Sequence, residues 1–170
     1  MSKRLSFVLR HRPDSVGLTL DAAGWVDVDD LLAALGWTRA RLEDVVARND
    51  KQRFTLDPTG TRIRASQGHS VRVDLGYAPE QPPAELFHGT VERFLPAILA
   101  EGLRPGSRHA VHLSPDVPTA RRVGARRGRP VVLRVDAAAM AADGAAFARS
   151  ANGVWLVATV PPRYLARLGG

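Results

Sequence analysis

The sequence predicts an α+β protein built from two lobes. Short amphipathic segments and one hairpin pattern occupy residues 1–75, and short apolar strands alternate with helices over residues 85–170. Between them, residues 76–84 carry three prolines and little hydrophobic pattern, which is typical of a linker. A chain of 170 residues is long enough for two small domains.

The first lobe begins with an amphipathic helix. Leu5, Val8 and Leu9 recur at helical spacing, and Pro13 indicates that this helix ends near His11.

Two further helices follow in the first lobe. Asp27 is placed to cap the N-terminus of a helix that Gly36 ends, and Thr38 is placed to cap the next helix. A hairpin is then expected from residues 53–56 and 61–64, joined by a turn at 57–60. Three short helices followed by a hairpin describe a winged-helix module.

The second lobe shows strand and helix patterns in alternation. Apolar strands are expected at residues 86–88, 111–113, 131–135 and 154–160. Helices are expected at residues 94–103 and from a cap at Ser114 or Asp116 to about residue 124.

The charge of the chain indicates an anionic partner. The net charge is +7, and it is uneven: residues 1–84 hold 12 basic and 11 acidic side chains, whereas residues 85–170 hold 12 and 6. All basic residues except Lys3 and Lys51 are arginines, whose planar guanidinium suits phosphates. GC-rich codons would produce the same arginine bias, so composition alone leaves both explanations open.

Several classes of protein are excluded or disfavoured. The chain has no cysteine, which excludes disulfides, thiolate metal sites and cysteine nucleophiles. No apolar stretch approaches the ~20 residues of a membrane span, and the basic start lacks the apolar core of a secretory signal. We expect a cytoplasmic monomer.

Four groups of polar residues interrupt otherwise structural segments. They are residues 9–13 at a helix end, residues 49–54 between a helix and a strand, residues 63–70 at a strand end, and the pair of strand ends at 87–90 and 111–114. Each alone has an ordinary structural explanation, because helix ends favour cations and turns favour polar residues.

In combination, these segments resemble the RNA 2'-phosphotransferases. The resemblance runs from about Leu5 to Val160. Its motifs are Ser-Phe-Val-Leu-Arg-His-Arg-Pro (6–13), Asn-Asp-Lys-Gln-Arg-Phe (49–54), Ile-Arg-Ala-Ser-Gln-Gly-His-Ser (63–70), Phe-His-Gly-Thr (87–90), Val-His-Leu-Ser (111–114) and Val-Gly-Ala-Arg-Arg-Gly-Arg-Pro-Val-Val-Leu (123–133). Each motif is weak alone, but six in order are not coincidental.

The resemblance implies an N-terminal winged-helix RNA lobe and a C-terminal NAD lobe of the ADP-ribosyltransferase fold. The implied catalytic residues are Arg10, His11, Arg53 and Arg126, with Arg127 as the alternative to Arg126. The implied NAD contacts are His88, Gly89, Thr90, His112 and Ser114, with Arg108 as a contact to the pyrophosphate.

The implied reaction has two steps and uses NAD as co-substrate. An RNA 2'-phosphate attacks the NAD ribose and expels nicotinamide, giving RNA-2'-phospho-ADP-ribose. The ribose 2''-hydroxyl then attacks phosphorus, which releases ADP-ribose 1'',2''-cyclic phosphate and RNA with a 2'-hydroxyl. Arginines can hold the phosphate and a histidine can move the proton, so we expect catalysis without a metal.

Two other functions remain as alternatives. One is an ADP-ribosyltransferase that modifies nucleic-acid ends or protein. Many such enzymes carry a glutamate on a late strand, but residues 151–155 contain none. The 2'-phosphotransferases also lack this glutamate. The other is a non-catalytic winged-helix protein that binds nucleic acid, which would give no role to the motifs at 87–90 and 111–114.

Overall fold

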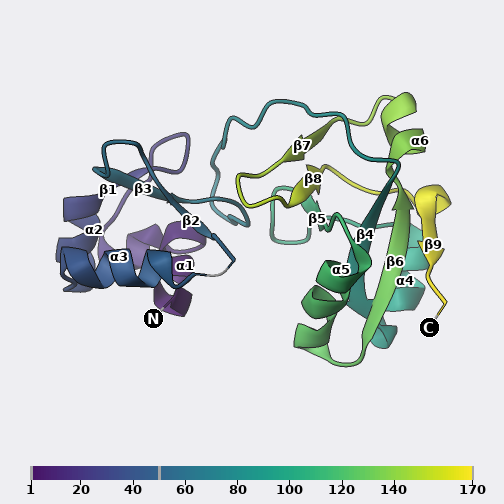
Figure 1. Ribbon diagram of the computed structural model, residues 1–170, viewed down its shortest axis with the longest axis horizontal. Helices are drawn as coiled ribbons and strands as arrows, with labels where there is room; N and C mark the ends of the chain where they lie inside the picture. Colours follow the sequence, from purple (N-terminus) through teal and green to yellow (C-terminus); the bar gives the residue numbers. More distant parts are fainter. Residues whose placement is uncertain (1, 50, 170) are drawn as a thin grey trace. The chain divides into compact units, whose positions relative to one another are not determined.

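The computed structural model describes residues 2–49 and 51–169, which form two compact units, Met1–Gly76 and Tyr77–Gly170 (Figure 1). Helices and antiparallel strands occur in both, so the protein is α+β, as predicted. Each unit has its own apolar core.

The helices of the first unit begin and end where the sequence indicates. Helix α1 spans Ser2–Arg10, α2 spans Val28–Leu35 and α3 spans Arg39–Ala47. The Asp27 carboxylate accepts backbone N–H bonds at the start of α2, and Gly36 adopts the left-handed conformation at its end. The Thr38 hydroxyl accepts a backbone N–H bond at the start of α3. The predicted caps at Asp27, Gly36 and Thr38 are therefore confirmed.

A small sheet completes the first unit. Strands β2 (Phe54–Leu56) and β3 (Arg62–Ala65) form the predicted hairpin. A short strand that was not predicted, β1 (Val26–Asp27), pairs with the other edge of β3. The order β1-β3-β2 buries Ile63 completely against the helices, which fixes the ends of the hairpin relative to α1.

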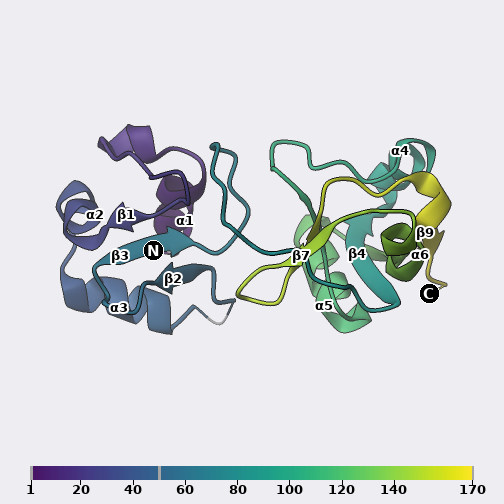
Figure 2. The same cartoon turned by 90° about the horizontal axis from the view of Figure 1, so that it is seen from above.

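The second unit is organised around two antiparallel sheets. One has the order β4-β6-β9, with β4 at Glu85–Val91, β6 at Pro130–Asp136 and β9 at Leu165–Arg167. The other has the order β5-β8-β7, with β5 at Val111–Leu113, β8 at Trp155–Val157 and β7 at Phe147–Arg149. Figure 1 shows α5 lying along β4 and β6, and Figure 2 shows α5 beside β4 from above.

Three helices pack on these sheets. They are α4 (Leu95–Glu101), α5 (Val117–Gly124) and α6 (Ala137–Ala142). Asp116 caps α5 as predicted, because its carboxylate accepts the Thr119 N–H at 2.7 Å. Short 3-10 turns occur at Pro13–Val16, Glu92–Phe94, Ala125–Arg127 and Pro162–Tyr164.

Some expected boundaries differ from the structure. The apolar run 154–160 was expected as one strand, but β8 ends at Val157 and Val160 instead pairs with Leu103. Helix α6 and strands β7 and β9 were not predicted, because they are short and lack a clear period.

The proline-rich segment expected as a linker belongs to the second unit. Pro79 pairs with Ala148, and the Glu80 N–H donates to the Phe147 carbonyl at 2.8 Å. A segment with few apolar residues can still be fixed by backbone pairing to a strand edge.

Candidate functional site

The first predicted pair, Arg10 and His11, lies where α1 ends. Arg10 is the last residue of the helix, and its side chain is only 9% exposed. The last carbonyls of a helix lack intrahelical partners, so they must be satisfied from elsewhere. Here the Arg10 carbonyl accepts the backbone N–H groups of Ser70 at 2.8 Å and Val71 at 3.3 Å.

The same loop also contacts the His11 side chain. Nδ1 of His11 lies 2.9 Å from the Ser70 hydroxyl, and these two residues are 59 positions apart in the chain. The run Gln67-Gly68-His69-Ser70, noted in the sequence but given no role, therefore connects strand β3 to the end of α1.

Arg53 lies at the other end of this loop. It precedes β2, and its carbonyl accepts the Ser66 N–H at 2.8 Å. The backbones of Arg53 and Arg10 are thus both bonded to residues 66–71, which places the three predicted residues of this unit around a single loop.

The turn before Arg53 is unusual in its backbone and burial. Gln52 has a φ of 40°, in the region that non-glycine residues seldom occupy. Asn49 is buried, and its side-chain amide makes no hydrogen bond with the described residues. Asp50 of the same motif lies outside the described residues.

In the second unit, two predicted strand ends meet. Phe87 and Ser114 exchange backbone hydrogen bonds of 2.9 and 2.7 Å, which join β4 to the end of β5. This bridge places His88 beside His112, with Nδ1 of His88 3.2 Å from the His112 carbonyl oxygen. The motifs at 87–90 and 111–114 therefore form one cluster.

The hydrogen bonds fix the proton positions on both imidazoles. A carbonyl oxygen only accepts, so His88 carries its proton on Nδ1 and offers the lone pair of Nε2. Burial is the largest cause and lowers the pKa of His88. The hydrogen bond to His112 opposes this effect, and the charges of Arg127 and Arg108 lower the pKa further, so His88 is neutral near pH 7. A guanidinium only donates, so His112 accepts at Nδ1 from Nη1 of Arg108, at 2.9 Å.

Three arginines lie within electrostatic range of one another in this cluster. Burial, and after it the positive charges of Arg127 and Arg126, lower the pKa of Arg108. Arginine nevertheless remains protonated, so the three like charges repel until an anion lies between them. The cluster therefore carries a positive charge that suits an anionic ligand.

Gly89 and Gly124 bring α5 against β4. A Cβ atom on Gly89 would lie 1.8 Å from the Ala120 carbonyl oxygen, so only glycine fits there. A Cβ on Gly124 would lie 2.8 Å from the Thr90 carbonyl oxygen, and Thr90 itself is buried. Successive side chains on a strand point to opposite faces, so His88 faces away from α5.

The structure thus forms two clusters from the predicted residues. Arg10, His11 and Arg53 surround one loop of the first unit. His88, Arg108, His112, Ser114 and Arg126 belong to the cluster in the second unit, while Gly89 and Thr90 hold α5 beside it. Arg127, the alternative to Arg126, also belongs to this cluster and lies 5.9 Å from the Phe94 ring.

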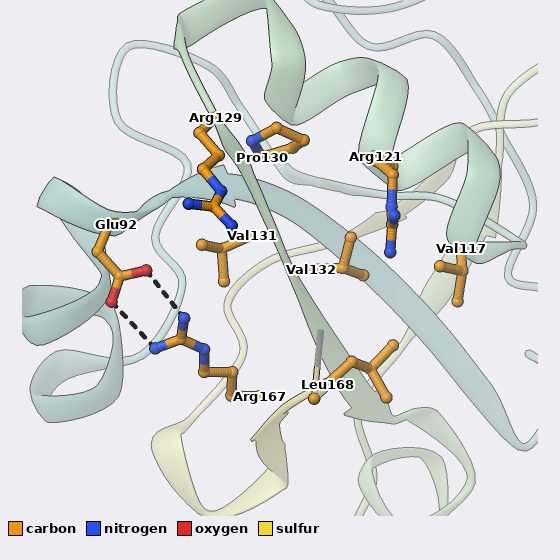
Figure 3. A pocket seen from close by; sticks show the side chains of 10 residues that line it. Glu92, Val117, Arg121, Arg129, Pro130, Val131, Val132, Arg167 and Leu168 are labelled. Carbon is orange, nitrogen blue, oxygen red and sulfur yellow. Dashed lines mark hydrogen bonds and ion pairs between the residues drawn. The ribbon is translucent and has the colours of Figure 1, made fainter.

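A separate hollow in the second unit contains none of the predicted residues. It has a volume of about 530 Å³ and lies between α5, the start of β6 and the end of β9 (Figure 3). Arg121 and Arg129 line it, and a two-bond ion pair joins Arg167 to Glu92 at 2.9 and 3.0 Å.

Neither a metal site nor a membrane span is evident in the parts described. Over residues 2–49 and 51–169, no group of three histidine or acidic side chains could hold a metal ion. The helices of these same ranges are all too short or too polar to cross a bilayer.

Comparisons with known proteins identify the family of this chain. Residues 1–159 match the RNA 2'-phosphotransferase, Tpt1 / KptA family. A probable RNA 2'-phosphotransferase of Streptomyces coelicolor is 61% identical over 97% of this chain and 92% of its own length. Proteins of the same name from Agrobacterium fabrum and Nostoc punctiforme are 58% and 52% identical, over 96% and 99% of this chain and 91% and 96% of their own lengths.

The chain belongs to the RNA 2'-phosphotransferase family and is a transferase that acts on the 2'-phosphate of RNA. The predicted class of enzyme is therefore confirmed.

Ser70 touches the predicted site at His11, but the sequence alone indicates no role for it. It lies in a motif that was noted, at the end of strand β3, but its contact with His11 joins segments far apart in the chain. The signal in the sequence that could have indicated a role for Ser70 is the polar run 67–70, which follows strand β3.

Proposed function

We propose that this enzyme removes an internal 2'-phosphate from RNA by transferring it to NAD. The single observation that carries the NAD assignment is the cluster around His88, where an imidazole bonded to the His112 carbonyl lies within electrostatic range of Arg108 and Arg127, and Arg108 in turn within range of Arg126. The arginines suit a pyrophosphate, and the Nε2 lone pair suits a ribose hydroxyl.

In our proposal, the first unit binds RNA and the second unit binds NAD. The first, with three helices and a three-stranded sheet, acts as a winged-helix lobe for RNA. The second acts as an ADP-ribosyltransferase-type lobe for NAD. We propose that the protein works as a cytoplasmic monomer and that Arg10, His11, Arg53 and Arg126 are its catalytic residues.

The first step needs positioning more than proton transfer. A 2'-phosphate dianion is already a nucleophile, and its oxygen bonds to C1'' as the bond from C1'' to nicotinamide breaks. Arginines hold a phosphate by two hydrogen bonds in a fixed orientation, which brings the reacting atoms into line. We propose that Arg10 and Arg53 bind the 2'-phosphate in this way.

The second step needs a base. The 2''-oxygen bonds to phosphorus, and the bond from phosphorus to the RNA 2'-oxygen breaks. Nε2 of His11 takes the 2''-hydroxyl proton and returns a proton to the departing 2'-oxygen. Arg126 and the other cations stabilise the charge that builds on the phosphoryl oxygens, so arginines do the work that metal ions do in many phosphoryl transfers.

The products test this proposal directly. The protein is incubated with NAD and an oligonucleotide that carries one internal 2'-phosphate, in EDTA, and the products are resolved by mass. We expect nicotinamide, ADP-ribose 1'',2''-cyclic phosphate and 2'-hydroxyl RNA. Free orthophosphate, or activity only with added divalent metal, would contradict the proposal, and a permanently ADP-ribosylated acceptor would favour the transferase alternative.

A further inference from the structure

We propose that Ser70 is a positioning residue that keeps the proton of neutral His11 on Nδ1, so that Nε2 is the atom that accepts a proton. This inference rests on the proposed role of His11 as the base of the second step. It is carried by contacts within the first unit alone.

The first support is that Ser70 is held in place by its backbone. Its N–H donates to the Arg10 carbonyl at 2.8 Å, and the Val71 N–H reaches the same oxygen at 3.3 Å. These bonds satisfy a carbonyl at the end of α1 and do not depend on the serine side chain. The hydroxyl is therefore presented to His11 by a fixed loop.

The second support comes from the single hydroxyl proton. Oγ of Ser70 lies 2.9 Å from Nδ1 of His11 and 3.5 Å from the Arg10 carbonyl oxygen. The carbonyl only accepts, so when the hydroxyl donates to it over this longer distance, the hydroxyl accepts from His11. Nδ1 then carries the proton, and Nε2 carries the lone pair that a base requires.

The third support is that this arrangement serves both charge states of His11. In the neutral imidazole, Nδ1–H donates to Oγ and Oγ–H donates to the Arg10 carbonyl. After Nε2 takes a proton, both bonds remain in the same direction. No hydroxyl has to rotate during the reaction, so the ring keeps one orientation through the second step.

The variants follow from the exposure of Ser70. Ser70→Ala removes the hydroxyl and keeps both backbone bonds, while Ser70→Thr keeps a hydroxyl and adds a methyl group on an exposed side chain. Ser15→Ala is the matched control, because Ser15 is also exposed, lies in the same unit and donates its hydroxyl to a backbone carbonyl, that of Arg12, at 2.6 Å.

The experiment is a single-turnover cycle with wild type, Ser70→Ala, His11→Ala and the double variant, following RNA, adduct and product. We expect Ser70→Ala to slow the second step by about 3- to 10-fold, the worth of one hydrogen bond, with nicotinamide release unchanged. Ser70→Thr should recover most of the rate, and Ser15→Ala should match wild type. In the His11→Ala background, Ser70→Ala should cost nothing further, since it acts only through the imidazole.

Two results would overturn the inference. One is a Ser70→Ala enzyme with the wild-type second-step rate. The other is a Ser70→Ala substitution that slows the second step by the same factor in the His11→Ala background as in wild type. A purely structural loss behaves in this way, because its free-energy cost adds to that of His11→Ala. Failure of the proposed function would look different, since wild-type enzyme would then form no adduct at all.

Discussion

The imidazole of His88 donates from Nδ1 to the carbonyl oxygen of His112, at 3.2 Å. This bond connects two strands from different sheets of the second unit, and it fixes which nitrogen of His88 can accept a hydrogen bond from a ligand. The NAD assignment depends on this relationship, so it is the first to test.

Replacing His88 by Ala should weaken NAD binding by about tenfold, because the ligand loses a hydrogen bond to a neutral, partly buried acceptor. Affinity for 2'-phosphorylated RNA should stay within a factor of two or so of wild type, because we assign RNA binding to the other unit. Titrations of both ligands measure this, with His109→Ala as the control. Loss of RNA binding with NAD binding intact would show that the lobes are assigned the wrong way round.

The stability of the second unit should fall in mild acid because of His88. Burial, its largest influence, lowers the pKa of this group in the folded protein below the ~6.5 of an unfolded chain. Below that pH the unfolded chain binds a proton that the folded chain resists, so the free energy of unfolding decreases as pH falls. Thermal unfolding between pH 8 and 5.5 should show a steeper decline for wild type than for His88→Gln. Parallel declines would show that His88 is not the group responsible.

Gly89→Ala should destabilise the second unit more than the addition of a single methyl group usually does. The added methyl group would lie 1.8 Å from the Ala120 carbonyl oxygen, which is backbone and cannot rotate away. We expect a loss of stability of about 1–3 kcal/mol from the displacement of α5, with loss of NAD affinity. Gly169→Ala is the control, since a Cβ there meets nothing within 4 Å. An unchanged melting temperature for Gly89→Ala would mean that α5 packs differently.

Arg126→Ala should slow the second step by about 100-fold, the usual loss when a fixed donor to a developing negative charge is removed. Arg127 also lies near Arg108 and His88, but it is 5.9 Å from the Phe94 ring, so we expect its removal to cost less. Arg122→Ala, whose guanidinium bonds to Thr119 within α5, is the control. A larger effect from Arg127→Ala than from Arg126→Ala would transfer the proposed role to Arg127.

Local rules account for most of what the sequence predicted correctly. The caps at Asp27, Thr38 and Asp116 bond to backbone groups two or three residues away, so their signals are contained in a few positions. The hairpin β2–β3 depends in the same way on a turn next to its strands.

What the sequence could not predict depends on contacts between distant segments. Strand β9 is defined by pairing with β6, about thirty residues earlier, and has no pattern of its own. The contact of His11 with Ser70 joins a helix end to a loop 59 positions later. Motif order indicated that both segments matter, but only the structure brings the two side chains together.

The most direct test of the central claim is a single-turnover time course of His11→Ala with NAD and 2'-phosphorylated RNA. We expect nicotinamide release to continue in part, because the phosphate nucleophile is already ionised. RNA-2'-phospho-ADP-ribose should accumulate, because the second step lacks its base. Wild-type enzyme should pass through the same adduct and finish at 2'-hydroxyl RNA. If His11→Ala abolished nicotinamide release and no adduct formed, His11 would not be the base of the second step.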